Sequence, residues 1–226
     1  MRLLFFDMEF ADGKVPGSIY SIGYLITDED FRVLVPPTDL LIDPESTWND
    51  YVVQNILAYP MEEIKEAPPF PQHYSALAEL FSSVDVAVGF SVNNDNRALL
   101  KDCQRYALPP LSYAYFDVEK LCRVIGEHPK ARGLGGCHAA WCGEDAQNPH
   151  RSDGDAYTTM QLLRAICRSK HATAQMMLEA YSECGGTTSV PKASQKAQGK
   201  KRRRRRGGKN AHNNKTTSEA KKGETA

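Results

Sequence analysis

The hydrophobic positions of the chain begin with a pattern that is typical of buried strands. Residues 2–6 form a short, continuous apolar run, which predicts a central strand covered on both faces. Residues 19–27 and 31–35 are rich in β-branched and aromatic residues and flank the acidic triplet 28–30, so they predict two further strands joined by a turn. The first part of the chain is therefore expected to fold as a three-stranded meander.

Beyond residue 50, helical and strand patterns alternate. Apolar residues recur at helical spacing in residues 72–82, and prolines in 67–71 separate this segment from an earlier helix. This alternation predicts an α/β layered domain. The expected helices are 51–58, 72–82, 95–106, 118–125, a segment around 139–142, 157–167 and 172–181, and the expected strands are 84–90 and 113–116.

The composition of the chain changes at Gly185 and Gly186. Residues 187–226 contain one Val and no Leu, Ile, Met or aromatic residue. Such a segment cannot bury enough apolar surface to offset the entropy lost on ordering. We therefore expect one folded domain over residues 1–184 and a disordered tail over residues 185–226.

The formal net charge of zero hides a division between these two regions. Residues 185–226 carry 13 basic and 2 acidic residues, a net charge of +11, and residues 1–184 therefore carry −11. An acidic domain with a basic tail predicts nucleic acid or another polyanion as a partner. Seven consecutive cations in the tail are candidates for nonspecific phosphate binding, with a merely solvated tail as the alternative. They are Lys200, Lys201, Arg202, Arg203, Arg204, Arg205 and Arg206.

The chain lacks the sequence features of membrane and secreted proteins. No apolar run approaches the roughly 20 residues that span a bilayer, and the apolar run at 2–6 soon meets acidic residues, unlike a secretory signal. The six cysteines form no C-x-x-C pair, so we expect reduced thiols in a cytoplasmic protein. A zinc site is a weaker reading because its spacing fits no common ligand pattern. Its ligands would be Cys137, Cys142, His138 and His150.

Asp-x-Glu occurs three times, and only its context distinguishes the pairs. The pair at 43–45 contains a proline and fits a loop, and the pair at 117–119 follows a short strand. Asp7 and Glu9 instead follow the most apolar strand, on which residues i and i+2 share a face. Two such carboxylates repel each other unless a cation binds between them. Solvated carboxylates at a strand end are the alternative.

His-x4-Asp occurs once, at His150 and Asp155. We expect His150 in a loop and Asp155 in the first turn of a helix whose N-cap is Ser152 or Asp153. Asp155 could then simply stabilise the helix dipole, and His150 could be a surface histidine. Asp95 is expected to open a helix after a strand, where N-capping is the structural alternative.

The order of these groups resembles the DEDDh branch of the DnaQ-like 3′–5′ exonucleases, over residues 2 to about 184. Those enzymes carry an acid pair on the first strand, an acid after a later strand, and His-x4-Asp opening a late helix. The resemblance implies a ribonuclease H-like α/β fold with a mixed five-stranded sheet flanked by helices. It also implies His150 as general base and four carboxylates that bind two divalent ions, Mg²⁺ or Mn²⁺. These carboxylates are Asp7, Glu9, Asp95 and Asp155.

The activity implied by this resemblance is hydrolysis of single-stranded DNA or RNA from the 3′ end, with release of nucleoside 5′-monophosphates. A replication or RNA-processing machine is a possible partner, and a binding or regulatory protein that kept the fold but has weak or no activity is the alternative. Residues 10–13 depart from the Thr-rich continuation of the family's first motif, so the substrate preference stays open. Arg151 stands where another branch of the superfamily has Tyr, which excludes that branch.

Overall fold

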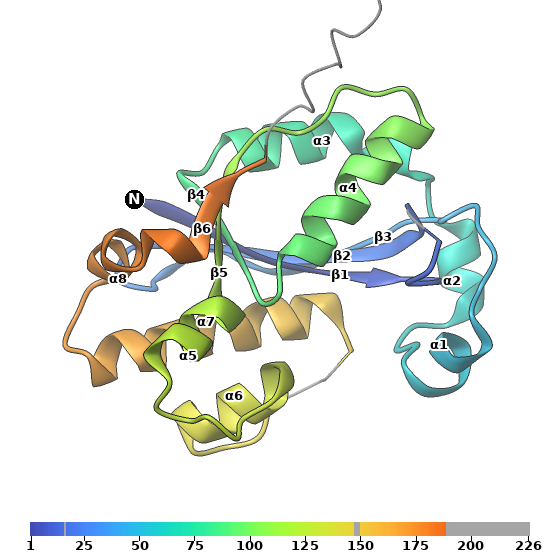
Figure 1. The fold of residues 1–226 in the computed structure, drawn as a ribbon. Helices are drawn as coiled ribbons and strands as arrows, with labels where there is room; N and C mark the ends of the chain where they lie inside the picture. The colour runs from blue at the N-terminus through green and yellow to red at the C-terminus, as the bar shows by residue number, and fades with distance from the viewer. Residues whose placement is uncertain (16, 147–149, 189–226) are drawn as a thin grey trace, which may run out of the picture. The chain divides into compact units, whose positions relative to one another are not determined.

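Residues 1–15, 17–146 and 150–188 are described by a computed structural model of the chain. Their centre is one mixed sheet with the strand order β3-β2-β1-β4-β5-β6 (Figure 1). A mixed sheet was expected, although with five strands rather than six. The strands are β1 (Arg2–Phe10), β2 (Ile19–Asp28), β3 (Val33–Leu41), β4 (Val86–Gly89), β5 (Ala114–Asp117) and β6 (Gly185–Thr187).

The strand directions bring distant parts of the chain to one edge of the sheet. β1, β2 and β3 form the expected antiparallel meander, whereas β4 is parallel to β1 and β5 is parallel to β4. The carboxyl ends of β1, β4 and β5 therefore lie at the same edge. β3 starts later than predicted and continues through Pro36 and Pro37. Proline lacks a backbone N–H, and β3 tolerates it because it is an edge strand.

Helices cover both faces of the sheet (Figure 1). α3 and α4 pack on one face, and α5, α6, α7 and α8 pack on the other. This arrangement is the predicted layered α/β architecture. The helices are α1 (Asp50–Asn55), α2 (Met61–Glu66), α3 (Phe70–Ser82), α4 (Asn93–Arg105), α5 (Val118–Ile125), α6 (Gly133–Cys142), α7 (Ser152–Ser169) and α8 (Ala174–Ala180), followed by the 3₁₀ turn η1 (Ser182–Cys184).

Successive side chains of β1 alternate between the two layers, as strand geometry requires. Leu3 and Phe5 join the cluster under α5–α8, and Leu4 and Phe6 join the cluster under α3 and α4. All four are fully buried. Each buried side chain of this size contributes roughly 1.5–3 kcal/mol to folding. β1 is therefore held firmly from both faces.

Several helix bounds differ from the sequence prediction, and two helices differ most because their patterns are weak. α2 was not predicted, since it is six residues long and buries only Ile64. α6 starts at Gly133 rather than near residue 139. Three glycines in its first turn, at positions 133, 135 and 136, conceal the start because glycine disfavours helix interiors.

The predicted boundary after residue 184 is wrong by a few residues, because β6 pairs with β5 as the sixth strand. A Cβ atom on Gly185 would lie 2.9 Å from the Tyr115 carbonyl oxygen, and one on Gly186 would lie 2.8 Å from the Tyr115 hydroxyl. At Gly185 the close atom belongs to the backbone, so only glycine permits this approach, whereas at Gly186 it is the end of a side chain that can move. The two residues that indicated the end of the domain thus form part of its sheet.

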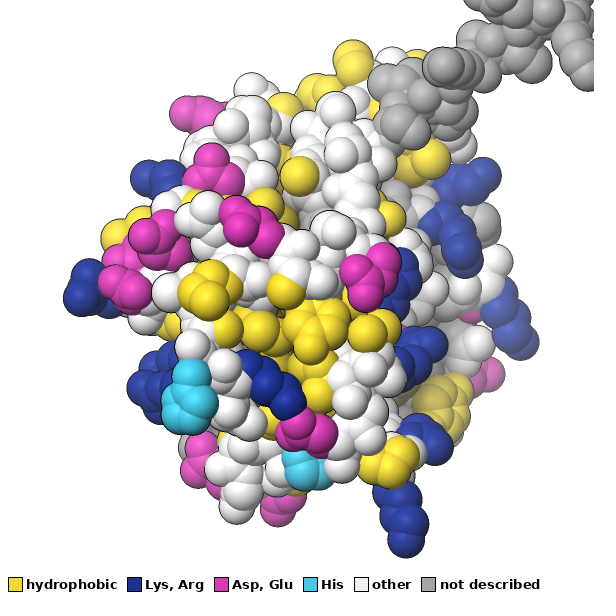
Figure 2. All heavy atoms as spheres, turned by 60° about the vertical axis from the view of Figure 1, so that its left-hand side comes forward, with side chains coloured by type: hydrophobic (Ala, Val, Ile, Leu, Met, Phe, Trp, Pro, Cys, Tyr) yellow, Lys and Arg dark blue, Asp and Glu magenta, His cyan; other side chains and the backbone are white. Residues whose placement is uncertain are grey.

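The rest of the expected disordered tail, including the cation run at 200–206, lies outside the described residues. Among the described helices, none combines the length and hydrophobicity needed to cross a membrane. Figure 2 shows the face that carries α8, where hydrophobic side chains are exposed between acidic and basic ones. Met176 of α8 and Val124 of α5 are each about half exposed.

Candidate metal centre

Asp7 and Glu9 occupy the carboxyl-terminal half of β1. Strand alternation gives them the same face as Leu3 and Phe5, which is the face covered by α7. The antiparallel register places Asp7 opposite Gly23 and Glu9 opposite Ser21. Of the three Asp-x-Glu pairs, this is the one held inside the sheet.

The first turn of α7 packs directly on β2 at Gly23. A Cβ atom at this position would lie 1.9 Å from the backbone nitrogen of Asp153 and 1.9 Å from the carbonyl carbon of Ser152. No side chain fits there, so glycine is required for the helix to approach the strand. Because Gly23 pairs with Asp7, this contact also brings the start of α7 beside the acids of β1.

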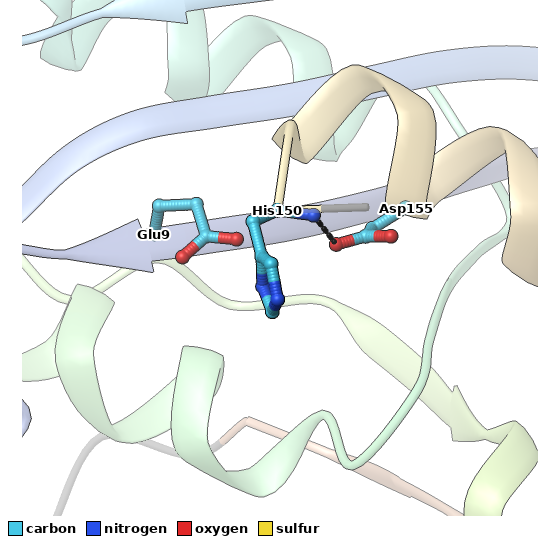
Figure 3. Close-up of side chains that lie close together, drawn as sticks. All are labelled: Glu9, His150 and Asp155. Atoms are coloured by element: carbon cyan, nitrogen blue, oxygen red, sulfur yellow. Dashed lines mark hydrogen bonds between the residues drawn. The ribbon is translucent and has the colours of Figure 1, made fainter. Parts of the chain in front are cut away.

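α7 thereby delivers His150 and Asp155 to the centre. One ligand atom from each of Glu9, His150 and Asp155 lies within 4.8 Å of the other two. In Figure 3, the His150 side chain stands between the two carboxylates. The backbone N–H of His150 donates to Oδ2 of Asp155 at 3.1 Å. Asp155 is in the first turn of α7, as predicted, but the N-cap is Arg151 rather than Ser152 or Asp153.

Asp95 reaches the centre from the first turn of α4, on the opposite face of the sheet. It is 4% exposed. The N-cap of α4 is Val92, which makes no side-chain capping bond, so Asp95 is not a capping residue. The helix N-terminus stabilises a negative charge there. Burial and then the nearby Glu9 carboxylate nevertheless raise the pKa of Asp95 well above its usual value.

The same forces act on the other acids. The pKa of Asp7 is raised well above its usual value by burial, then by Asp95, Glu9 and Asp155. Burial raises the pKa of Glu9 to about 8, with further contributions from Asp155 and Asp39. The pKa of Asp155 is raised by burial, and the backbone N–H of His150 opposes this increase. The structure thus brings all four predicted acids and His150 within electrostatic reach of one another.

The chemistry of this cluster fits divalent cations. Its donors are carboxylate oxygens, which are hard ligands suited to Mg²⁺ or Mn²⁺, and buried carboxylates that repel one another are stabilised by positive charge. The buried hydroxyl of Tyr20 has no hydrogen-bond partner among the described residues, and the charges of Glu9 and Asp7 add to the burial that raises its pKa. An unpaired polar atom this close to the acids indicates a place for a bound ion or its water.

The alternative hypothesis, a zinc site, is wrong: the described residues do not form one. The cluster around Glu9 is the one group of three or more His, Cys, Asp or Glu side chains there that has metal-binding geometry. Nδ1 of His138 instead contacts the Glu144 carbonyl oxygen at 3.1 Å. The other Asp-x-Glu pairs are structural as well: Asp117 caps α5 by accepting bonds from the backbone of residues 119 and 120.

Asp39 of β3 lies at the centre of a hydrogen-bond network beside the cluster. It was not predicted from the sequence. Its Oδ1 accepts bonds from the Ser152 hydroxyl at 2.7 Å and the Ser21 hydroxyl at 3.1 Å. Its Oδ2 accepts from Arg151 at 3.1 Å and from the Tyr59 hydroxyl. The guanidinium of Arg151 also lies 4.9 Å from the centre of the Tyr59 ring. These contacts fix the residues that directly follow His150. Asp39 lies 112 residues from Arg151 in the sequence, so no local motif identifies it.

Comparison with known proteins supports the same fold. No protein-family model and no curated protein sequence matches the chain. Among solved structures, it is similar to the nuclease domain of 3′hExo, a DEDDh family member bound to rAMP, with a TM-score of 0.62 at 12% identity, covering 74% of this chain and 92% of that one. It is also similar to E. coli exonuclease I in complex with a dA16 oligonucleotide, with a TM-score of 0.65 at 16% identity.

The second similarity covers 79% of this chain but 42% of exonuclease I. The chain is also similar to a 3′-exonuclease that recognises the histone mRNA stem-loop, with a TM-score of 0.62 at 11% identity. This third similarity covers 64% of that protein. The chain thus spans less than two thirds of both these proteins. At such identities the similarity establishes the fold alone: the chain has the fold of these 3′-exonucleases, as expected from the sequence.

Proposed function

We propose that this protein is a metal-dependent 3′–5′ exonuclease of the DEDDh type. It would release nucleoside 5′-monophosphates from the 3′ ends of single-stranded DNA or RNA. The observation that carries this proposal is the convergence of four buried or half-buried acids and an exposed histidine at the end of β1. The shared fold with 3′-exonucleases supports a nuclease, and the acid cluster supports hydrolysis.

In this proposal, each residue of the cluster has a distinct role. Asp7, Glu9, Asp95 and Asp155 hold two divalent cations. Such ions, when bound, activate the attacking water and stabilise the leaving 3′ oxygen. His150 is exposed beside Glu9 and Asp155, where its imidazole would act as the general base. The hydrogen bond from its backbone to Asp155 ties the position of the base to a ligand.

The substrate class rests on the same chemistry and on the related structures. 3′hExo is described with rAMP, and exonuclease I with DNA oligonucleotides. Stepwise release of mononucleotides requires a strand that reaches the cluster with a free 3′ end. Both sugars are therefore included in the proposal, and the preference between them is a matter for direct comparison.

The test is an incubation of the full chain with a 5′-labelled single-stranded oligonucleotide, as DNA and as RNA, in Mg²⁺ or Mn²⁺. We expect stepwise shortening from the 3′ end that disappears with EDTA and in Asp7→Asn. A 3′-phosphorylated strand serves as the control for the need for a free end. Binding without shortening in either metal would contradict the enzyme and favour a nucleic-acid-binding protein.

The tail cations at 200–206 extend this proposal. A basic segment attached to an acidic domain would raise the local concentration of a polyanionic substrate. Removal of residues 189–226 should then weaken oligonucleotide binding and flatten its salt dependence, while the rate at saturating substrate is retained. Unchanged salt dependence would show that the tail is not a phosphate anchor.

A further inference from the structure

A hollow of about 460 Å³ is lined by residues that directly neighbour Glu9 and Asp95 in the chain. One wall follows β1 and includes Phe10, the residue after Glu9. The other wall is α4, beginning at Asn94, the residue before Asp95. The hollow therefore lies between the chain that follows β1, which carries Asp7 and Glu9, and α4, which carries Asp95, and none of the four acids lines it. A polymer whose end is bound at the acid cluster can extend into this hollow.

Three exposed cations line this hollow: Lys14, Arg97 and Lys101. None of them forms an ion pair with a described residue. The lining contains one acid, Asp12, and its carboxylate already accepts a hydrogen bond from the Lys14 backbone N–H at 2.8 Å. The hollow thus has an excess of positive charge beside a centre of negative charge.

This local excess of positive charge contrasts with the net charge of −11 that residues 1–184 carry. Arg97 and Lys101 are four residues apart on α4, which places them on the same side of the helix, about 6 Å apart along its axis. They follow one another away from Asp95. Cations arranged in this order can contact successive anionic groups.

We propose that this hollow binds the phosphodiester backbone of the substrate strand on the 5′ side of its terminal nucleotide. The inference rests on the proposed exonuclease function, which places the terminal phosphodiester at the acids. The preceding phosphates then meet Lys14, Arg97 and Lys101. The half-buried Phe10 ring and the exposed Val15 side chain offer apolar surface to a base between them. Contacts to phosphates carry no sequence information, so this binding is independent of sequence.

The test compares two triple variants of the full chain. In the first, Lys14, Arg97 and Lys101 are changed to Ala. In the matched control, Lys65→Ala, Lys130→Ala and Arg168→Ala remove the same number of exposed lysines and arginines outside the hollow. Affinity for a fluorescent single-stranded 12-mer is measured by anisotropy at several salt concentrations, with Asp7→Asn in every protein to prevent hydrolysis.

We expect the hollow variant to bind at least about tenfold more weakly, and the slope of log affinity against log salt to become shallower by about 2, because three phosphate contacts are lost. The control should stay close to the parent. In proteins with Asp7 intact, the hollow variant should raise KM for the 12-mer. It should retain turnover of thymidine 5′-monophosphate p-nitrophenyl ester, which has no phosphate beyond the one that is cleaved.

Equal binding by the parent and the hollow variant would overturn the inference, and so would equal losses in the hollow and control variants, which would indicate a general charge effect. Matching thermal midpoints confirm that all the variants fold. If the unmutated protein hydrolyses neither the 12-mer nor the small ester, the proposed function itself fails. If it hydrolyses both and the hollow variant behaves like the parent, only the inference fails.

Discussion

The two helices that bring acids to the end of β1 are held in different ways. α7 starts against Gly23 of β2, and the residues after His150 are hydrogen-bonded through Asp39 to two neighbouring strands. Both helices start without a side-chain cap, but the first residues of α4, Asn93 and Asn94, are exposed. α4 is positioned instead by apolar packing, with Leu99 and Cys103 buried on the sheet.

This difference indicates that the two sides of the centre have different roles. Directional hydrogen bonds hold a position more narrowly than apolar packing does, so the side carrying His150 is the more preorganised. In the proposed function, the exposed face of α4 would receive the substrate strand. Changes beneath α7 should therefore act on the chemical step, and changes on the exposed face of α4 should act on binding.

The largest expected effects come from removing one acid on each side. Asp95→Asn and Asp155→Asn should each lower kcat by about 10³-fold, because in the proposed function both acids would hold the same pair of ions despite their different supports. Oligonucleotide hydrolysis at saturating Mg²⁺ measures this loss. Substantial activity in either variant would mean that its helix does not contribute a ligand.

Gly23→Ala should break the side of the centre that carries α7. The added Cβ atom has to displace the start of the helix, and a shift of about 1 Å can cost about 100-fold in rate. Overpacking of this kind also lowers stability by about 1–3 kcal/mol. Urea unfolding and kcat are the measurements, and Gly135→Ala is the control, since its Cβ would meet nothing within 4 Å. Equal behaviour of the two variants would refute the close contact.

Asp39→Asn should have an intermediate effect. The amide keeps the shape but loses the charge that pairs with Arg151, so we expect about 10-fold lower kcat with little change in KM. Asp50→Asn, on the exposed start of α1, is the matched control. A rise in KM with normal kcat would contradict the view that this network orients His150 rather than binding substrate.

The smallest effect is on the pH dependence of stability in metal-free protein. Glu9, with its pKa raised from 4.5 to about 8, binds a proton more tightly in the folded than in the unfolded state. The stability that this proton provides is present below pH 4.5 and is lost as pH rises through about 8. Asp7 and Asp95 act in the same direction.

The acids of the two helices should contribute differently to this pH dependence. The pKa of Asp95 is raised well above its usual value, whereas the rise at Asp155 is opposed by a hydrogen bond from His150. Asp95→Asn should therefore flatten the pH profile of the thermal midpoint more than Asp155→Asn. The opposite order would show that Asp155 carries more of the repulsion. Mn²⁺ should reduce the pH dependence in the parent protein, since it favours the charged acids.

The sequence predicted those parts of the centre that depend on local pattern and chain order. The apolar run into Asp7 indicated a buried strand, and α5 was predicted with its observed bounds. Gly23 could have been noticed, because a glycine inside a strand often marks a close backbone approach. The pairing of Asp39 with Arg151 spans 112 residues, and the cations of the hollow come from two separate segments. Such proximity arises only when the sheet is assembled.

The central claim is that the acids from β1, α4 and α7 form one site for two divalent ions. Titration of the metal-free protein with Mn²⁺, followed by electron paramagnetic resonance of the free ion, tests this claim most directly. The account predicts two bound ions per chain, and the loss of at least one in both Asp95→Asn and Asp155→Asn. Binding by the parent protein that is no greater than binding by an Asp7→Asn, Glu9→Gln double variant would contradict it.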